Sequence, residues 1–218
     1  MVKAKMLKLA LLVVGLLVGF LGGSSAFSES GQQLATKLSE LQVQNLTLTR
    51  ENQHLKYING LAMEFSMDPM IVTLVDHYSR EYLKAGGSEW RLLRTPEFMT
   101  YIMLSVIYAE SKGDPKAIGD GGEARGLTQI WTSTARDYGE VTAEDLLDAE
   151  TNISYSFKHF HYLLKKYEGN LALALYSWNR GHGTVDRLLL YGASPQNGYA
   201  KKVYEATLIH NRETMIGQ

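Results

Sequence analysis

The most regular pattern of apolar positions in this chain is a row of leucines spaced seven residues apart. The row consists of Leu34, Leu41, Leu48 and Leu55. If these leucines are the d positions of a heptad, the a positions are Leu38, Asn45, Asn52 and Asn59. Leucine at d with Asn at a is typical of a parallel two-stranded coiled coil, in which the buried Asn fixes the register. A single amphipathic helix lying along a domain explains the pattern equally well. We therefore expect residues 28–60 to form a helical stalk, with a homodimer through residues 34–59 as one of the two alternatives.

Helical spacing continues through most of the remaining chain. Apolar residues keep it from residue 61 to residue 84, and Pro69 is expected to begin a new helix within that segment. Thr95-Pro96-Glu97 has the order of an N-cap, a first-turn proline and an early acid, which predicts a helix that runs to Glu110. A further helix is predicted over residues 171–185, ending in a Gly-x-Gly turn. Alternation typical of strands is scarce, so the predicted fold is mostly α.

The amino terminus combines three lysines with a long uncharged stretch. Lys3, Lys5 and Lys8 precede residues 9–27, which carry no charge and include the small residues Ser24 and Ala26. This order is typical of a secretory signal that is cleaved after Ala26. It also suits a retained membrane anchor, since a spanning helix needs about 20 apolar residues. Residues 1–27 are therefore predicted to be a signal peptide or a membrane anchor, and either alternative implies export of the rest of the chain.

Composition narrows the function classes. Hydrophobic residues make up 45% of the 218 residues and charged residues 21%, which is typical of a globular protein. The net charge of −1 gives no indication of a nucleic-acid partner. The absence of cysteine excludes disulfides and thiol nucleophiles. His159 and His161 would face nearly opposite sides of a helix, so they do not chelate together, and we predict no metal site and no cofactor.

Glu110 stands at the end of an apolar helix face, which is an unusual position for a charge. On a helix it shares that face with Val106 and Ile107. Partial burial disfavours the ionised carboxylate and raises its pKa, and a Glu that stays protonated near neutral pH suits a general acid. The alternative is a helix-end acid that turns to water or pairs with Lys112 or Arg125.

A glycine-rich loop and an aromatic helix end add to this picture. The loop, GDGGEARGLTQI over residues 119–130, contains glycines that permit positive φ and close approach of the backbone to a ligand. The helix end carries Trp178 and Asn179, and aromatic and amide side chains suit sugar faces and acetamido groups. Taken alone, this helix end is equally typical of core aromatics beside a helix cap.

Four short motifs occur in a fixed order along the chain. They are Glu110-Ser111, Gly126-Leu127-Thr128-Gln129, Trp178-Asn179-Arg180-Gly181 and Tyr199-Ala200-Lys201-Lys202-Val203. Together they resemble the soluble lytic transglycosylase (SLT) family, a branch of the lysozyme superfamily related to goose-type lysozyme. The resemblance covers residues 96–206. The chain departs from the family pattern where Thr128 stands for Met, Trp178 for Tyr and Arg180 for Ala.

The resemblance implies a fold, an activity and a set of site residues. It implies a mostly α, lysozyme-like catalytic domain over residues 96–212, preceded by connecting helices over residues 61–95. The implied activity is cleavage of the MurNAc–GlcNAc β-1,4 bond of peptidoglycan, with Glu110 as the single catalytic acid and base and a 1,6-anhydro product. The residues implied to bind the sugar are Ser111, Gly126, Leu127, Gln129, Trp178, Asn179 and Tyr199.

The resemblance also leaves two alternatives open. Most glycosidases use two carboxylates, and a hydrolytic muramidase becomes the better answer if Glu123 reaches across the site. A non-catalytic peptidoglycan-binding or assembly protein is the other alternative. In every case the expected partner is a peptidoglycan glycan strand. The expected location is the bacterial envelope or periplasm, with the protein either secreted or anchored in the inner membrane.

Overall fold

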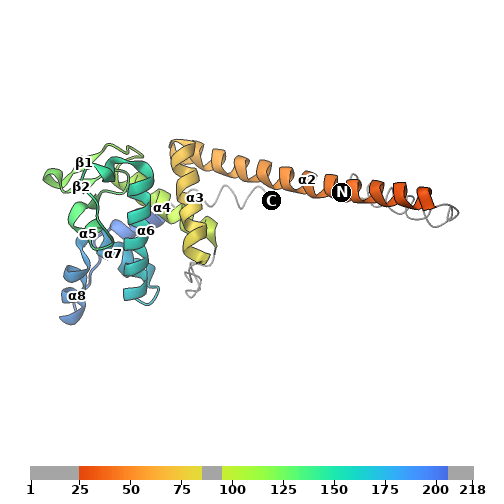
Figure 1. Ribbon diagram of the computed structural model, residues 1–218. Helices are drawn as coiled ribbons and strands as arrows, with labels where there is room; N and C mark the ends of the chain where they lie inside the picture. Colours follow the sequence, from red (N-terminus) through yellow and green to blue (C-terminus); the bar gives the residue numbers. More distant parts are fainter. Residues whose placement is uncertain (1–24, 85–94, 206–218) are drawn as a thin grey trace. The chain divides into compact units, whose positions relative to one another are not determined.

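The computed structural model describes residues 25–84 and 95–205, and the chain divides into two compact units, Met1–Tyr57 and Ile58–Gln218. Helices dominate the described residues, so the predicted fold class is confirmed as mostly α (Figure 1). Most of the predicted signal or anchor, residues 1–24, lies outside the described residues. Among the residues that are described, no helix combines the length and the hydropathy needed to cross a bilayer.

Helix α2, Ser25–Phe65, is one continuous helix of 41 residues that includes the whole predicted stalk. The four d-position leucines are each between 52% and 59% exposed, so this apolar row is uncovered in the single chain. The last turns of α2 differ, because Ile58, Leu61 and Phe65 are buried within the second unit. The helix is as predicted, whereas its role as a stalk or as a coiled coil stays a prediction.

Two helices begin where the sequence predicted. Helix α3, Pro69–Lys84, starts with the Asp68 side chain accepting a hydrogen bond from the backbone N–H of Met70 at 2.8 Å. Helix α4, Pro96–Glu110, starts at the N-cap Thr95, whose hydroxyl oxygen accepts from the backbone N–H of Phe98 at 3.2 Å. Every residue of α4 from 99 to 107 is buried. α3 packs against α4 and α6, so α4 lies inside the second unit with Glu110 at its carboxyl end.

A small antiparallel sheet was not predicted. Its strands are β1, Ile118–Gly119, β2, Ala124–Arg125, and β3, Ile130–Trp131, in the order β1-β2-β3. The short 3-10 turn η3, Asp120–Gly122, connects β1 to β2. Strands of two residues are too short to produce the alternation by which a strand is recognised in a sequence.

The remaining helices complete the second unit. They are α5, Thr132–Arg136, the 3-10 turn η4, Asp145–Leu147, α6, Ala149–Lys166, α7, Leu171–Arg180, α8, His182–Leu190, and a helical segment over residues 199–205. The helix predicted to run through Trp178 and Asn179 into the glycine turn is confirmed as α7, which Gly181 ends at φ +78°. The start of α8 directly after Gly181 was not predicted. A residue with positive φ cannot continue a right-handed helix, so the chain changes direction beside the candidate site.

Candidate active site

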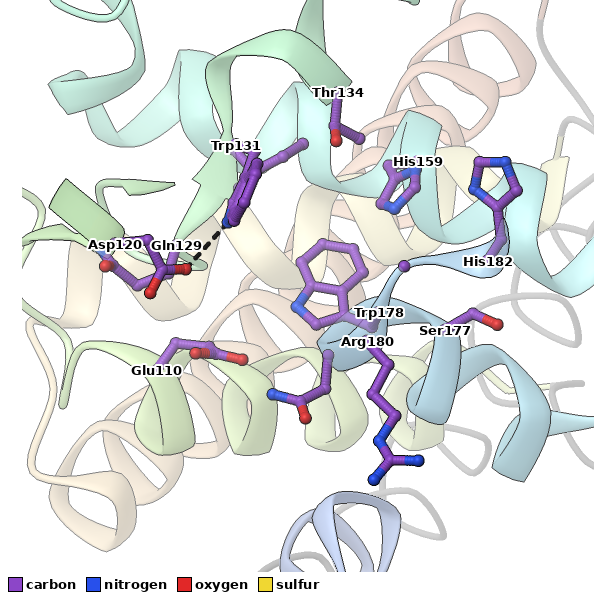
Figure 2. A pocket seen from close by; sticks show the side chains of 13 residues that line it. Glu110, Asp120, Gln129, Trp131, Thr134, His159, Ser177, Trp178, Arg180 and His182 are labelled. Carbon is purple, nitrogen blue, oxygen red and sulfur yellow. Dashed lines mark hydrogen bonds between the residues drawn. The ribbon is translucent and has the colours of Figure 1, made fainter. Parts of the chain in front are cut away.

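Glu110 lines a pocket of about 360 Å³ that is formed by the sheet, the end of α4, α6 and the junction of α7 and α8 (Figure 2). Three of the other predicted site residues line it with Glu110: Gln129, Trp178 and Asn179. The stripe of apolar residues on α4 delivers Glu110 to the pocket, since Val106 and Ile107 on the same face are fully buried. The helix ends at this point because Ser111 leaves helical geometry and Lys112 takes φ +59°.

Burial is the main influence on the Glu110 carboxyl group. Loss of hydration raises the pKa of Glu110, as the sequence predicted, and the Tyr199 hydroxyl, which donates a hydrogen bond to Oε1 at 2.6 Å, opposes that rise. Lys202 also lowers the pKa, while the negative charge of Asp120 raises it. The net effect is a raised pKa, so Glu110 retains its proton to higher pH than a free glutamate does.

Tyr199 is the direct hydrogen-bond partner of Glu110 and is only 9% exposed. Burial and the adjacent Glu110 carboxylate raise the pKa of Tyr199, so its hydroxyl remains a donor. The backbone N–H of Tyr199 donates to the side-chain oxygen of Asn197 at 3.1 Å, and the Asn197 amide donates to the side-chain oxygen of Asn179 at 2.7 Å. These hydrogen bonds connect the end of α7 to the catalytic candidate.

Ser111 and Leu127 are not among the residues that line the pocket. The Ser111 hydroxyl donates to the backbone oxygen of Leu127 at 2.7 Å, and the Leu127 side chain is fully buried. This hydrogen bond joins the end of α4 to the loop that carries Gln129. The two residues therefore fix the position of the loop relative to Glu110.

Gly126 and Gln129 hold the loop in shape. Gly126 has φ +66°, and a Cβ there would lie 2.3 Å from the backbone oxygen of Leu146, so no larger residue fits. The Gln129 amide donates to the backbone oxygens of Ala117 at 3.1 Å and Gly126 at 2.9 Å. Both amide donors of Gln129 are thus used by the loop, while its side chain forms part of the pocket wall.

Thr128 replaces the methionine of the resembled pattern and is fully buried. Its hydroxyl hydrogen-bonds with Asn152 and with Ser156, two residues of α6. Asn152 also accepts from the backbone N–H of Thr128 at 3.1 Å and donates to the backbone oxygens of Arg125 and Leu146. The substitution therefore places the loop on a satisfied polar network instead of an apolar contact.

Comparison with known proteins identifies the family of the segment that carries the pocket. Residues 92–197 match the family model described as the transglycosylase SLT domain. This segment of the chain is an SLT domain. The resemblance drawn from the four motifs is therefore confirmed. The chain is also similar to the 70 kDa soluble lytic transglycosylase of Escherichia coli, a solved structure, with 26% identity over 53% of this chain and a TM-score of 0.46. The aligned part spans 22% of that protein.

The pocket of the SLT domain contains residues that sequence reasoning did not assign to it. Those with side chains able to contact a ligand are Asp120, Trp131, Thr134, His159, Arg180 and His182. Asp120 accepts a hydrogen bond from Nε1 of Trp131 at 3.0 Å (Figure 2). This pair depends on the register of the small sheet, so only a prediction of that sheet could have found it.

His159 forms part of the floor of the pocket, where its ring lies 5.3 Å from that of Trp178. It is only 8% exposed, and its Nδ1 is 2.9 Å from the Tyr138 hydroxyl. Burial, with a smaller effect of His182, lowers the pKa of His159 to about 4, so this ring is neutral near pH 7. Among the described residues, no group of three or more His, Cys, Asp or Glu side chains could hold a metal ion. The His159 ring packs against those of Tyr162 and Trp178.

The pocket of the SLT domain brings one further carboxylate near Glu110, and it is not Glu123. Glu123 is exposed and lies outside the lining, whereas Asp120 lines the pocket and raises the pKa of Glu110 by its charge. In the hydrolase alternative, the candidate for a second carboxylate is therefore Asp120 of the same loop, and not Glu123.

Proposed function

We propose that this protein is a lytic transglycosylase that cleaves the MurNAc–GlcNAc β-1,4 bond of peptidoglycan and leaves 1,6-anhydro-MurNAc ends. One observation carries the proposal: the SLT domain has a partly buried glutamate with a raised pKa beside an aromatic and amide-lined pocket. Such a carboxyl group suits proton donation to a poor leaving group.

In the proposed reaction Glu110 acts first as an acid and then as a base. Its proton moves to the glycosidic oxygen as the bond from that oxygen to C1 of MurNAc breaks. The C6 hydroxyl oxygen of the same MurNAc then bonds to C1, and its proton returns to the Glu110 carboxylate. No water is consumed, and assistance from the substrate's own acetamido group would make a second carboxylate unnecessary.

Tyr199 serves both halves of this cycle. Its hydroxyl, 2.6 Å from Oε1, stabilises the carboxylate that exists between the two proton transfers. Burial alone would make that carboxylate costly, so the two opposing influences keep Glu110 able to give up a proton and to take it back.

The proposed role of each predicted site residue depends on whether its side chain lines the pocket. Trp178 and Asn179 line the pocket and are proposed to contact the sugar ring and its acetamido group. Gln129 is proposed to contribute through its oxygen, since both of its amide donors are used by the loop. Ser111, Gly126 and Leu127 are proposed to act by holding the loop in place.

Substitution of Glu110 by Gln tests the proposal. Glu110→Gln is expected to abolish solubilisation of purified sacculi while the circular dichroism spectrum and melting remain those of a folded protein. Glu123→Gln, an exposed acid of the adjacent loop, is the matched control and is expected to keep full activity. Activity retained by Glu110→Gln would refute the role of this residue.

Hydrolysis is the second candidate, and the presence of Asp120 in the pocket favours it. Two carboxylates on one site permit activation of a water molecule. Mass spectrometry of the released fragments separates the candidates. Anhydro-muropeptides identify the lyase, and reducing MurNAc ends identify the muramidase.

We also propose that the enzyme is exported and works in the cell envelope, with residues 1–27 as its signal or anchor. Residues 28–60 are proposed to form a stalk, and residues 61–95 to connect it to the catalytic domain over residues 96–212. Fractionation of bacteria that express the full chain, followed by intact-mass measurement, tests the first part. Loss of residues 1–26 identifies a cleaved signal, and a full-length species in the membrane fraction identifies an anchor.

The exposed leucine row of α2 supports a homodimer through residues 34–59. The full chain is expected to sediment as a dimer, and Leu41→Glu with Leu48→Glu is expected to give a monomer, because charges on the d positions cannot be buried in a coiled-coil seam. A monomeric parent protein at micromolar concentration would contradict the dimer.

A further inference from the structure

Trp131 is a large aromatic side chain that remains 48% exposed beside the candidate catalytic acid. It ends β3 and lines the same pocket as Glu110 and Trp178. Trp131 extends into the pocket from the side of the sheet, while Trp178 reaches it from α7 (Figure 2). The two indoles therefore reach the pocket from different elements, and Trp178 packs against the rings of His159 and Phe160.

Asp120 holds the Trp131 ring. Its Oδ2 accepts the indole N–H at 3.0 Å, a charge-assisted hydrogen bond that fixes the plane of the ring but does not cover its face. The small residue Ala124 lies opposite both Gly119 and Trp131 in the sheet register, so the Asp120 side chain can reach across β2.

The backbone of Asp120 is itself held in a rare conformation. Asp120 has φ +46°, in the left-handed region that costs a non-glycine residue about 1 kcal/mol. Strain of this kind persists where the surrounding structure requires it and is concentrated at functional sites. In this backbone conformation the Asp120 carboxylate lies within hydrogen-bond distance of the Trp131 indole N–H.

We propose that Trp131 is a sugar-stacking residue for this reaction and that Asp120 is its positioning residue. An N-acetylhexosamine ring of a β-1,4-linked glycan would pack its apolar face on the indole, beside Glu110. The inference rests on the proposed function, because it assigns a subsite of the same pocket. Neither residue takes part in proton transfer.

Binding of a soluble β-1,4-linked GlcNAc oligomer tests the stacking directly. The measurement uses the full chain carrying Glu110→Gln, which holds the oligomer without cutting it, and isothermal titration calorimetry. Trp131→Ala in this background is expected to weaken binding about 3- to 10-fold, the range given by the loss of one aromatic contact. Tyr191→Ala, which removes a ring that is 79% exposed away from the pocket, is the control and is expected to leave Kd unchanged.

The Asp120 variants test positioning. Asp120→Asn keeps an acceptor for the indole N–H and is expected to bind within about twofold of the parent, whereas Asp120→Ala frees the ring and is expected to weaken binding about threefold. In chains that retain Glu110, Trp131→Ala is expected to raise KM for soluble glycan and to leave kcat unchanged.

Three results would overturn the inference. One is an unchanged Kd for Trp131→Ala, and another is the absence of measurable binding by the parent. The third is a collapse of kcat in Asp120→Asn, which would make Asp120 a second catalytic carboxylate. Failure of the proposed function is a separate observation, namely cleavage that survives Glu110→Gln, and it does not depend on the binding series.

Discussion

Removal of the Tyr199 hydroxyl is the most direct way to change the proton affinity of Glu110. Tyr199→Phe keeps the buried ring and deletes only the group that donates to Oε1 at 2.6 Å. A hydrogen bond to a charged group contributes about 1.5–3 kcal/mol, and about 1.4 kcal/mol corresponds to a tenfold change in an equilibrium constant. Because Glu110 is partly exposed and water replaces some of the lost stabilisation, we apply the lower end of that range. The variant is expected to bind the Glu110 proton about tenfold more tightly.

The sign of the effect on the rate follows from the role of the proton. Glu110 must be protonated to act as an acid, so activity falls as pH rises through its pKa. Tyr199→Phe raises the pKa of Glu110 further, because the hydrogen bond that opposed the rise is gone. The alkaline limb of the pH profile of kcat/KM is therefore expected to move to higher pH, and kcat is expected to fall because the intermediate carboxylate loses its donor.

The assay is release of soluble fragments from labelled sacculi, recorded over a range of pH for the parent and the variant. Tyr204→Phe, a change on the same helical segment at a residue for which no contact with Glu110 is seen among the described residues, is the control and is expected to leave the profile unchanged. An alkaline limb that stays in place, or moves to lower pH, in Tyr199→Phe would refute the argument from burial and hydrogen bonding.

Three further predictions concern stability, each measured by urea denaturation. Because the fold raises the pKa of Glu110, its stabilising effect is fully present below the ordinary pKa of a glutamate and is lost as pH rises through the folded value. Glu110→Gln is expected to lack this decline above the ordinary glutamate pKa, and parallel curves would contradict it. Gly126→Ala is expected to lower the free energy of unfolding by about 2–4 kcal/mol, because the added Cβ would strike the Leu146 backbone. Gly121→Ala, at φ +63° with open space around it, is expected to lower it by about 1 kcal/mol, and equal losses in the two variants would show that the contact with Leu146 is unimportant. Asn152→Ala is expected to cost about 3 kcal/mol, because it leaves several buried partners without hydrogen bonds, and a loss below about 1 kcal/mol would contradict this.

Local rules predicted the features that depend on a few neighbouring residues. The starts of α3 at Pro69 and of α4 at Thr95 follow from proline and capping chemistry, and both were correct. The raised pKa of Glu110 followed from its place on an apolar helix face. In these cases the sequence contains the cause within one or two turns of helix.

Features that depend on tertiary register were not predictable in this way. The Asp120–Trp131 pair forms because three strands of two residues each align in a sheet, and the local sequence contains no pattern that predicts this alignment. Gly181 was visible as a glycine, but the immediate start of α8 after it was not. Tyr199 was expected in the cleft from the resemblance, whereas its bond to Glu110, from a helical segment far along the chain, required the folded structure.

The support of Glu110 extends beyond the part of the chain that matches the SLT model. That match begins at residue 92, yet α4 is buried along its whole middle, and a helix that is apolar on all sides must be covered on all sides. Helix α3, which precedes the match, supplies part of the cover through Val72 and Val75, both fully buried. The buried Asp76 of α3 accepts a hydrogen bond from Arg80 on the same helix, and Arg80 lies 3.6 Å from Oε1 of Glu97 on α4, so these charges join the two helices. Because Glu110 is the last residue of α4, any shift of α4 against α3 would move its carboxyl group relative to Tyr199. The geometry of the catalytic candidate thus depends on a helix that we expected only to connect.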